Sequence, residues 1–240
     1  MELLGTLSPP WWLLLLPLLV LLLWARRRSP WEPRKCPTDL TGKTVIVTGA
    51  NSGIGKCVAT DLARRNARTI LACRSRERGQ AAVEEIRAAT GNPAVVLRLL
   101  DTGSLASVRA FADAVLREEP RLDVLVNNAG VTGTCRAAAP TGGWNKPSAW
   151  GSCGGIWGPL LAHPLLCTDL LKASAPARVV NVSSFRHSVG TADSAFLTGQ
   201  RRPPGYDAAY NSTKLMNVLF TAELARRLQG TGGSGRHRSG

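Results

Sequence analysis

The chain has 240 residues, 44% of them hydrophobic and 19% charged, and a formal net charge of +14. This hydrophobic content excludes a chain that is disordered throughout, and the length allows one sizeable domain and an appendage. The basic residues form short groups without interleaved aromatic residues, so we interpret them as membrane-flanking and solvated charge and expect no nucleic-acid partner. The six cysteines show no CxxC pair and no metal-ligand spacing with the three histidines, which predicts free thiols in a reducing compartment and no metal site.

The first predicted element is an apolar segment at residues 3–25, which holds no charged residue and is followed by three arginines at 26–28. About 20 apolar residues suffice for a helix to cross the hydrocarbon layer, so residues 1–25 are expected to form a transmembrane anchor. The arginines on its C-terminal side predict that the rest of the chain faces the cytosol. Two alternatives stay open. One is a cleavable signal peptide, against which Glu2 and the lack of a small-x-small cleavage site argue, and the other is an interfacial hairpin, which three prolines in the segment would favour.

After a proline-rich linker at 26–40, short apolar strands alternate with segments of helical periodicity. The strands are expected at 43–50, 68–74, 94–101, 121–130 and 177–184. The helices are expected at 53–67, 77–90, 105–119 and 207–229. Continuously apolar strands separated by helices predict an α/β fold with a parallel sheet that is buried on both faces. The domain is expected to span 41–230 with an atypical segment at 134–164, and the low-complexity tail at 231–240 should be disordered.

A glycine-rich stretch, TGANSGIG at residues 48–55, lies between the first predicted strand and the first predicted helix. Its glycines allow a tight turn and a close backbone approach to a pyrophosphate, which would then rest on a helix N-terminus. A glycine-rich turn alone is often only a turn, but the strand–turn–helix context predicts a nucleotide site. The candidate cofactor residues of this turn are Gly49, Asn51, Ser52, Gly53, Ile54 and Gly55.

Basic residues follow the second predicted strand, where an NAD site usually has an acidic residue that binds the ribose 2′-hydroxyl. This chain has Arg74 and then Arg76, and Lys56 lies just inside the first predicted helix. Cations at this place favour a 2′-phosphate, so the predicted cofactor is NADP or NADPH. The alternative is that Arg74 is only a surface residue at a strand end.

A second motif, YNSTK at 210–214, lies on the last predicted helix, where i, i+4 spacing places Tyr210 and Lys214 on one face. An ammonium group beside a phenol favours the phenolate and lowers the pKa of a tyrosine from about 10, so Tyr210 could act as general acid or base. Lys214 could also hold the nicotinamide ribose. Ser184, at the end of the fifth predicted strand, could hydrogen-bond the reacting carbonyl or hydroxyl. Each signal is weak alone, because such a pair occurs by chance in many helices and serines commonly end strands.

Together and in this order, the motifs TGxxxGxG, Asp101 after the third strand, NNAG at 127–130, Ser184 and Tyr210-x-x-x-Lys214 resemble the short-chain dehydrogenase/reductase family. The likeness is greatest to its microsomal retinol dehydrogenase branch and covers about residues 40–131 and 166–232. It implies a Rossmann-type doubly wound parallel sheet. It also implies an NADP-dependent oxidoreductase that interconverts a lipophilic alcohol, such as retinol, with its aldehyde or ketone.

The resemblance also implies a role for each matching residue. Tyr210 would be the acid/base, Lys214 the ribose ligand that modulates the tyrosine, and Ser184 the hydroxyl that orients the substrate. Asp101 would lie at the adenine, and the backbone of Asn128, Ala129 and Gly130 would line the cofactor cleft. The same resemblance implies an endoplasmic reticulum membrane protein with its catalytic domain in the cytosol, and it leaves a homo-oligomer open.

The sequence departs from the family at two places. Gly155 stands where the family has a helical asparagine that supports a proton-relay water, and residues 134–164 hold glycine, proline and tryptophan at spacings that a helix would not accept. At its end the chain lacks the expected sixth and seventh strands, so the fold is expected to be C-terminally truncated. One hypothesis for both departures is altered splicing, a reading-frame slip or a gene-model error, and its rival is a genuine membrane-contacting or substrate-capping insertion. A catalytically silent chain that at most binds nucleotide is therefore the alternative function.

Overall fold

The structure is a computed structural model, and it describes residues 17–21, 36, 38–102, 104–130, 170–193 and 206–228. The chain divides into two units, Met1–Thr38 and Asp39–Gly240. In the first unit residues 17–21 are helical, and the rest of the predicted membrane anchor lies outside the described residues. Within the described ranges, no helix is both long and apolar enough to cross a bilayer. The atypical segment at 134–164 and the predicted tail at 231–240 also lie outside them.

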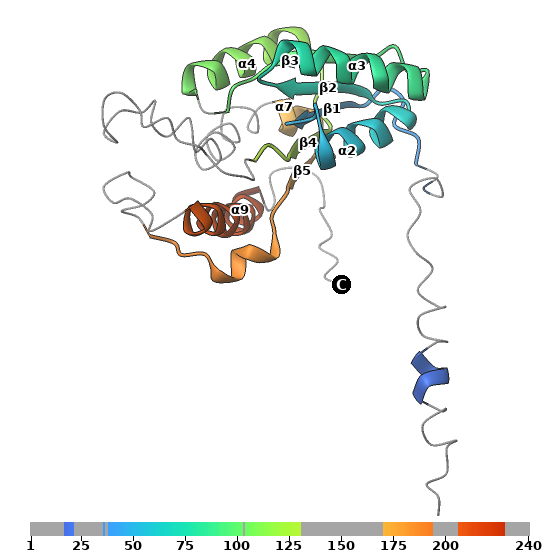
Figure 1. Cartoon of the computed structure of the whole chain (residues 1–240). Helices are drawn as coiled ribbons and strands as arrows, with labels where there is room; N and C mark the ends of the chain where they lie inside the picture. Colours follow the sequence, from blue (N-terminus) through green and yellow to red (C-terminus); the bar gives the residue numbers. More distant parts are fainter. Residues whose placement is uncertain are drawn as a thin grey trace, which may run out of the picture. The chain divides into compact units, whose positions relative to one another are not determined.

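The second unit contains a parallel sheet (Figure 1). Its described strands are β1 (Thr44–Thr48), β2 (Arg68–Cys73), β3 (Val95–Leu99), β4 (Val124–Asn127) and β5 (Arg178–Asn181), in the order β3-β2-β1-β4-β5. All four neighbouring pairs are parallel, and Ile46 at the centre of β1 lies opposite Ile70 of β2 and Leu125 of β4. The predicted parallel α/β sheet is confirmed, and its strand order is that of a Rossmann-like fold.

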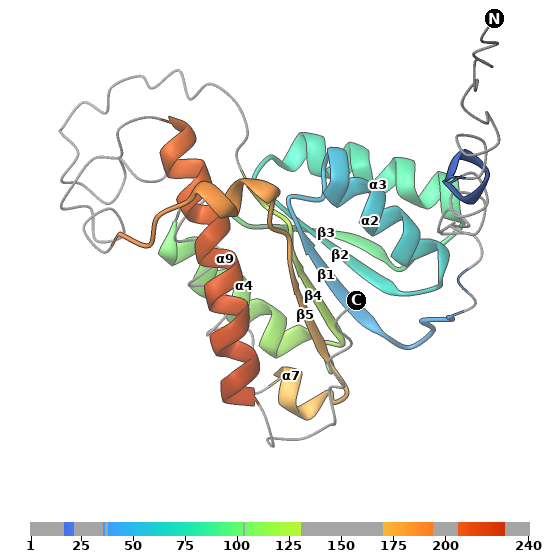
Figure 2. The same cartoon turned by 90° about the horizontal axis from the view of Figure 1, so that it is seen from below.

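Helices cover both faces of the sheet (Figure 2). The described helices are α2 (Gly53–Arg64), α3 (Arg76–Thr90), α4 (Leu105–Glu118), α7 (Leu170–Ala173), the short 3-10 helix η2 (Phe185–Val189) and α9 (Tyr206–Leu228). Apolar residues of α2 and α3 pack with Val45 and Val47 on one face, and those of α4 and α7 pack with Ile46 and Leu125 on the other. This alternation along β1 shows that the sheet is doubly wound, as expected.

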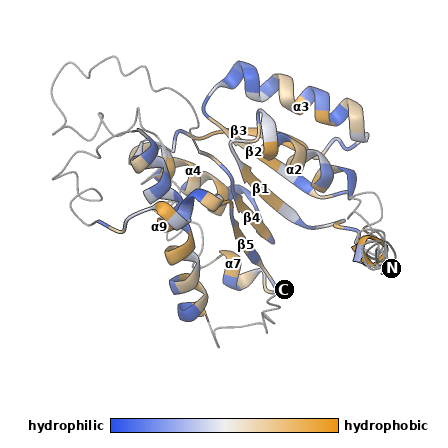
Figure 3. Cartoon of the chain, turned by 60° about the horizontal axis from the view of Figure 1, so that its bottom comes forward, coloured by the Kyte–Doolittle hydropathy of each residue, from blue (hydrophilic) through white to orange (hydrophobic). Residues whose placement is uncertain are grey.

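The central strands are more deeply buried than the outer ones. All five residues of β1 are buried, whereas exposed and half-buried residues alternate along β5. Figure 3 shows hydrophobic residues along the central strands and hydrophilic ones on the outer side of α3. The prediction that every strand is buried on both faces is therefore wrong for β3 and β5, which are the edge strands of the described sheet and each have a neighbour on one side only.

A buried carboxylate ties the start of β1 to the start of β4. Asp123 accepts hydrogen bonds from the Nζ atom of Lys43 at 3.0 Å and from the backbone N–H of Thr44 at 3.0 Å, and Arg121 donates to both of its oxygens. Burial raises the pKa of Asp123, but the hydrogen bonds from Arg121, Thr44 and Lys43 outweigh it and hold the pKa below its usual value. The carboxylate therefore stabilises the strand pair in its ionised form.

Candidate functional site

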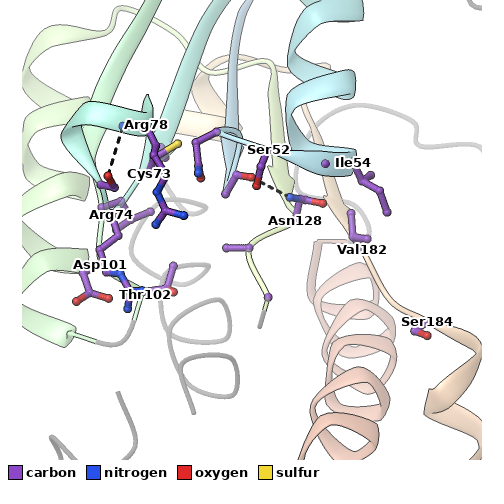
Figure 4. A pocket seen from close by; sticks show the side chains of 18 of the residues that line it. Ser52, Ile54, Cys73, Arg74, Arg78, Asp101, Thr102, Asn128, Val182 and Ser184 are labelled. Carbon is purple, nitrogen blue, oxygen red and sulfur yellow. Dashed lines mark hydrogen bonds between the residues drawn. The ribbon is translucent and has the colours of Figure 1, made fainter. Parts of the chain in front are cut away.

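The candidate site is a cleft of about 650 Å³ at the carboxyl ends of the strands (Figure 4). Open parallel sheets bind ligands at this edge, because the loops after neighbouring strands meet there. The lining includes the predicted residues Gly49, Asn51, Ser52, Gly53, Ile54, Arg74, Asp101, Asn128, Ala129, Gly130, Ser184, Tyr210 and Lys214. It also includes residues that the sequence analysis did not single out, namely Ala72, Cys73, Ser75, Arg78, Leu100, Thr102, Val182 and Ser183.

The turn after β1 needs glycine at two positions. Gly49 has a φ of +65°, and a Cβ atom built on it would lie 3.0 Å from the Cα atom of Ala129. A Cβ atom on Gly55 would lie 2.4 Å from the Nδ2 atom of Asn128 and 2.6 Å from the carbonyl oxygen of Gly49. Gly55 was predicted to bind cofactor, and in the structure it packs against the turn and the β4 loop. Because Gly55 has no Cβ atom, the turn after β1 can pack closely against the start of α2 and the side chain of Asn128.

Hydrogen bonds join this turn to the loop after β4. Asn128 donates from Nδ2 to the carbonyl oxygens of Thr48 at 3.1 Å and Gly49 at 3.4 Å. The Oγ1 atom of Thr48 accepts from the backbone N–H groups of Asn128 at 3.1 Å and Ala129 at 3.0 Å. These hydrogen bonds hold together the two loops that would face a cofactor. The Asn128 side chain uses its amide group to bond to the backbone of the turn after β1.

The start of α2 points into the same cleft. Within the described residues, no side chain caps this helix start, and its first turn holds no acidic residue. Ser52 and Gly53 line the cleft. Unsatisfied N–H groups and the positive end of the helix dipole favour an anion at such a place. The turn and the helix start together have the geometry and charge of a phosphate-binding site.

Two arginines lie at one end of the cleft, near Asp101 and Thr102 (Figure 4). Arg74 follows β2, as predicted, and Arg78 lies in the first turn of α3. The backbone N–H of Arg78 donates to the Oγ atom of Ser75, which caps this helix, at 3.4 Å. Sequence reasoning missed Arg78, although its spacing of four from Arg74 and the serine cap could have indicated it. This end of the cleft therefore carries two positive charges.

The other two predicted cations lie elsewhere. Lys56 forms an ion pair with Glu85 of α3, and Arg76 lines a separate groove between α3, β3 and α4. Cys73 lines the cleft with a buried thiol, and burial raises the pKa of that thiol, which favours its neutral form. The cationic end of the cleft is thus built by Arg74 and Arg78.

The predicted pair on α9 is brought together. The Nζ atom of Lys214 lies 5.6 Å from the centroid of the Tyr210 ring, and both residues line the cleft. Lys214 is 7% exposed, and its Nζ atom donates to the carbonyl oxygen of Val182 at 3.1 Å. Burial lowers the pKa of Lys214. The ammonium group of Lys214 thus lies within cation–π distance of the Tyr210 ring.

Ser184 lies at the end of the cleft away from the arginines (Figure 4). It precedes η2, and its Oγ atom accepts a hydrogen bond from the backbone N–H of Arg186 at 3.4 Å. The preceding hydroxyl, of Ser183, donates to the carbonyl oxygen of Lys214 at 2.9 Å. Within this pair of serines, Ser183 links the strand end to α9, whereas the Ser184 hydroxyl accepts from Arg186 and has no acceptor for its proton among the described residues.

Comparisons with known proteins agree with this geometry. A family model described as short chain dehydrogenase matches residues 43–232. The chain is 50% identical over 196 residues to dehydrogenase/reductase SDR family member 13 of Bos taurus, covering 80% of this chain and 49% of that protein. It is 48% identical over 199 residues to retinol dehydrogenase 13 of Homo sapiens, covering 82% and 58%. The chain thus spans about half of the length of these curated relatives.

The fold is also similar to that of a solved short-chain oxidoreductase. The crystal structure of a metagenomic short-chain oxidoreductase in complex with NADP is 27% identical, with a TM-score of 0.62, and the match covers 82% of this chain and 80% of that one. The likeness therefore extends over most of the described sheet and helices.

Proposed function

Because this chain belongs to the short-chain dehydrogenase family, we propose that it is an NADP-dependent oxidoreductase that interconverts a lipophilic alcohol with its aldehyde or ketone. The observation that carries the proposal is that one cleft collects the glycine turn, the arginine pair, Ser184 and the Tyr210–Lys214 pair. A nucleotide seat and a proton-transferring group in the same cleft are what a hydride-transfer reaction requires.

The residues present fit a dinucleotide phosphate. The glycine turn and the start of α2 would receive the pyrophosphate, Arg74 and Arg78 would bind the 2′-phosphate, and Asp101 would lie at the adenosine. Lys214 would hold the nicotinamide ribose from the other end of the cleft. When bound, the nicotinamide would supply or accept the hydride. The NADP-bound metagenomic relative supports this choice of cofactor.

In the proposed mechanism, Tyr210 moves the proton. During alcohol oxidation its phenolate oxygen would take the hydroxyl proton, and during reduction the phenol would return it to the carbonyl oxygen. The ammonium group of Lys214, near the ring, would stabilise the phenolate. The hydroxyl of Ser184 would donate a hydrogen bond to the substrate oxygen and orient it.

A lipophilic substrate is supported by the apolar residues near the cleft. Ile54 lines it and is 66% exposed, and in η2, directly after Ser184, Phe185 is 83% exposed and Val189 is 65% exposed. Large exposed apolar side chains beside a polar cleft are typical of a site that binds an apolar ligand. The name of the human relative, a retinol dehydrogenase, makes a retinoid the first substrate to test.

We also propose that residues 1–25 anchor the chain in the endoplasmic reticulum membrane with the domain in the cytosol. The support is the uncharged stretch and the three arginines that follow it. Alkaline carbonate extraction of microsomes tests the anchor, and protease protection tests the orientation. Release of the full chain into the soluble fraction would refute the anchor.

The enzymatic proposal is tested with the purified full chain in detergent. Fluorescence titration with NADPH is expected to show saturable binding, and all-trans-retinal is expected to be reduced. Tyr210→Phe should keep NADPH binding and lose turnover by at least about a hundredfold, the scale of lost general acid catalysis. Binding without any wild-type turnover would support the catalytically silent alternative. Lack of NADPH binding would refute the cofactor assignment.

A further inference from the structure

A side chain outside the predicted motif shares a hydrogen-bond acceptor with Lys214. Asn217, on the same helix, donates from Nδ2 to the carbonyl oxygen of Val182 at 3.2 Å. The Nζ atom of Lys214 donates to that same oxygen at 3.1 Å. The amide and the ammonium group are therefore neighbours around one backbone carbonyl, directly after β5 and before the cleft serines.

Val182, whose carbonyl oxygen accepts both bonds, is held by the sheet as well as by the helix. The backbone N–H of Val182 donates to the carbonyl oxygen of Asn127 at 2.9 Å. A carbonyl oxygen has two lone pairs, and Asn217 and Lys214 supply one donor for each. Because the amide uses one lone pair, the ammonium group is confined to the other. Its remaining two N–H bonds are then left for the cleft, where a Cβ atom built on Gly130 would lie 3.6 Å from Nζ.

The helix turn that carries Asn217 is also linked to the sheet. The Oγ1 atom of Thr221 donates to the backbone carbonyl oxygen of Asn217 at 2.6 Å and accepts from the Nδ2 atom of Asn181 at 2.8 Å. The Oδ1 atom of Asn181 accepts from Asn127 of β4 at 3.1 Å. Lys214, Asn217 and Thr221 are spaced i, i+3 and i+7, so they lie on one face of α9.

We propose that Asn217 is a positioning residue that acts through the Val182 carbonyl and holds the ammonium group of Lys214 where it can reach both Tyr210 and the cofactor ribose. The inference rests on the proposed function, because the task of Lys214 comes from it. A merely structural asparagine would stabilise the contact between α9 and β5 whatever residue stood at 214. A positioning asparagine matters for the site only while Lys214 is present.

A double-mutant cycle on NADPH affinity separates these two roles. The variants are Asn217→Ala, Lys214→Ala and the two combined, all in the full chain, with Kd measured by fluorescence titration. We expect Asn217→Ala to weaken NADPH binding about tenfold in the wild-type background, the scale of one charge-assisted hydrogen bond. In the Lys214→Ala background the same change should alter Kd by less than about twofold. Equal losses in both backgrounds, or no loss in either, would overturn the proposal.

Ser174→Ala is the matched control. Ser174 is buried at the other end of the sheet, and its Oγ atom accepts a hydrogen bond from the backbone N–H of Leu122 at 2.8 Å. Its loss should lower the urea midpoint about as much as the loss of the Asn217 amide does, because each removes one hydrogen bond, and it should leave Kd unchanged. Urea unfolding shows that every variant is folded at the assay temperature. A tenfold weaker NADPH affinity in this control would also overturn the proposal, because stability alone would then explain the loss.

A kinetic measurement keeps this inference distinct from the proposed function. With retinol as substrate, Asn217→Ala should lower kcat, raise the pH of half-maximal kcat by about one unit, and leave the KM for retinol within about twofold. An unchanged pH profile would contradict the inference even where kcat falls. If the wild type binds NADPH but turns over nothing, the proposed function fails while the cycle on Kd still decides the role of Asn217. If it does not bind NADPH, both fail.

Discussion

Gly55→Ala puts a methyl group against the two groups that keep the nucleotide turn in shape. The new Cβ atom would lie 2.4 Å from the Nδ2 atom of Asn128 and 2.6 Å from the backbone oxygen of Gly49. The asparagine side chain can swing away, but only by giving up its hydrogen bonds to Thr48 and Gly49, and the backbone oxygen cannot move without opening the turn.

The magnitude follows from three contributions. Overpacking costs about 1–3 kcal/mol, loss of the shared Asn128 hydrogen bonds to Thr48 and Gly49 costs about 1 kcal/mol in all, and alanine in place of glycine in a helix returns about 0.5–1 kcal/mol. The net expectation is a loss of about 2 kcal/mol in the free energy of unfolding. The shifted turn should also raise the Kd for NADPH at least about tenfold.

Gly91→Ala supplies a control with a similar cost to stability. Gly91 ends α3 with a φ of +70°, and a Cβ atom there would meet no atom of the described residues within 4 Å. Alanine in this left-handed conformation costs about 1–2 kcal/mol. Urea unfolding and NADPH titration are measured for both variants. The reasoning is refuted if Gly55→Ala binds NADPH as tightly as Gly91→Ala, or if it is as stable as the wild type.

Two further predictions concern charge. Arg74→Ala and Arg78→Ala should each weaken NADPH binding by about 10–100-fold, the scale of a charge-assisted hydrogen bond, and leave NADH binding nearly unchanged. If only Arg74→Ala weakened NADPH binding, the assignment of Arg78 to the 2′-phosphate would be wrong. For Asp123, the lowered folded pKa means that its stabilisation is present above the ordinary pKa of about 3.9 and is lost as the pH falls through the folded value. Asp123→Asn should therefore be less stable at pH 7, and its urea midpoint should fall less between pH 5 and pH 2 than that of the wild type.

Local sequence patterns predicted most of the sheet and the helices around it. Strand β1 and helix α2 were expected at 43–50 and 53–67 and are observed at Thr44–Thr48 and Gly53–Arg64. These elements are determined by apolar periodicity and by the glycine turn, which are local properties. The lower burial of β3 and β5 was missed, because a strand's position in a sheet depends on pairing with distant segments.

The site residues that sequence reasoning missed depend on contacts between elements. Lys56 was placed at the 2′-phosphate, but α2 and α3 pack side by side, and Glu85 of α3 pairs with it. Arg78 reaches the cleft because α3 begins just before it. The proposed role of Asn217 depends on its hydrogen bond to the carbonyl oxygen of Val182, which follows from the packing of α9 against the end of β5. The spacing of residues within α9 does not indicate this partner.

The hydrogen bonds between Thr48 and Asn128 join residues that are 80 positions apart in the chain. During synthesis the nucleotide turn is thus made early but remains unfinished until β4 has emerged and paired with β1. Long-range pairing of this kind is a slow part of folding. NADPH would bind only chains that have completed it, and at a hundredfold excess over its Kd it would stabilise them by about 2.7 kcal/mol. The cellular supply of reduced cofactor would then influence how much folded protein accumulates, in addition to how fast it works.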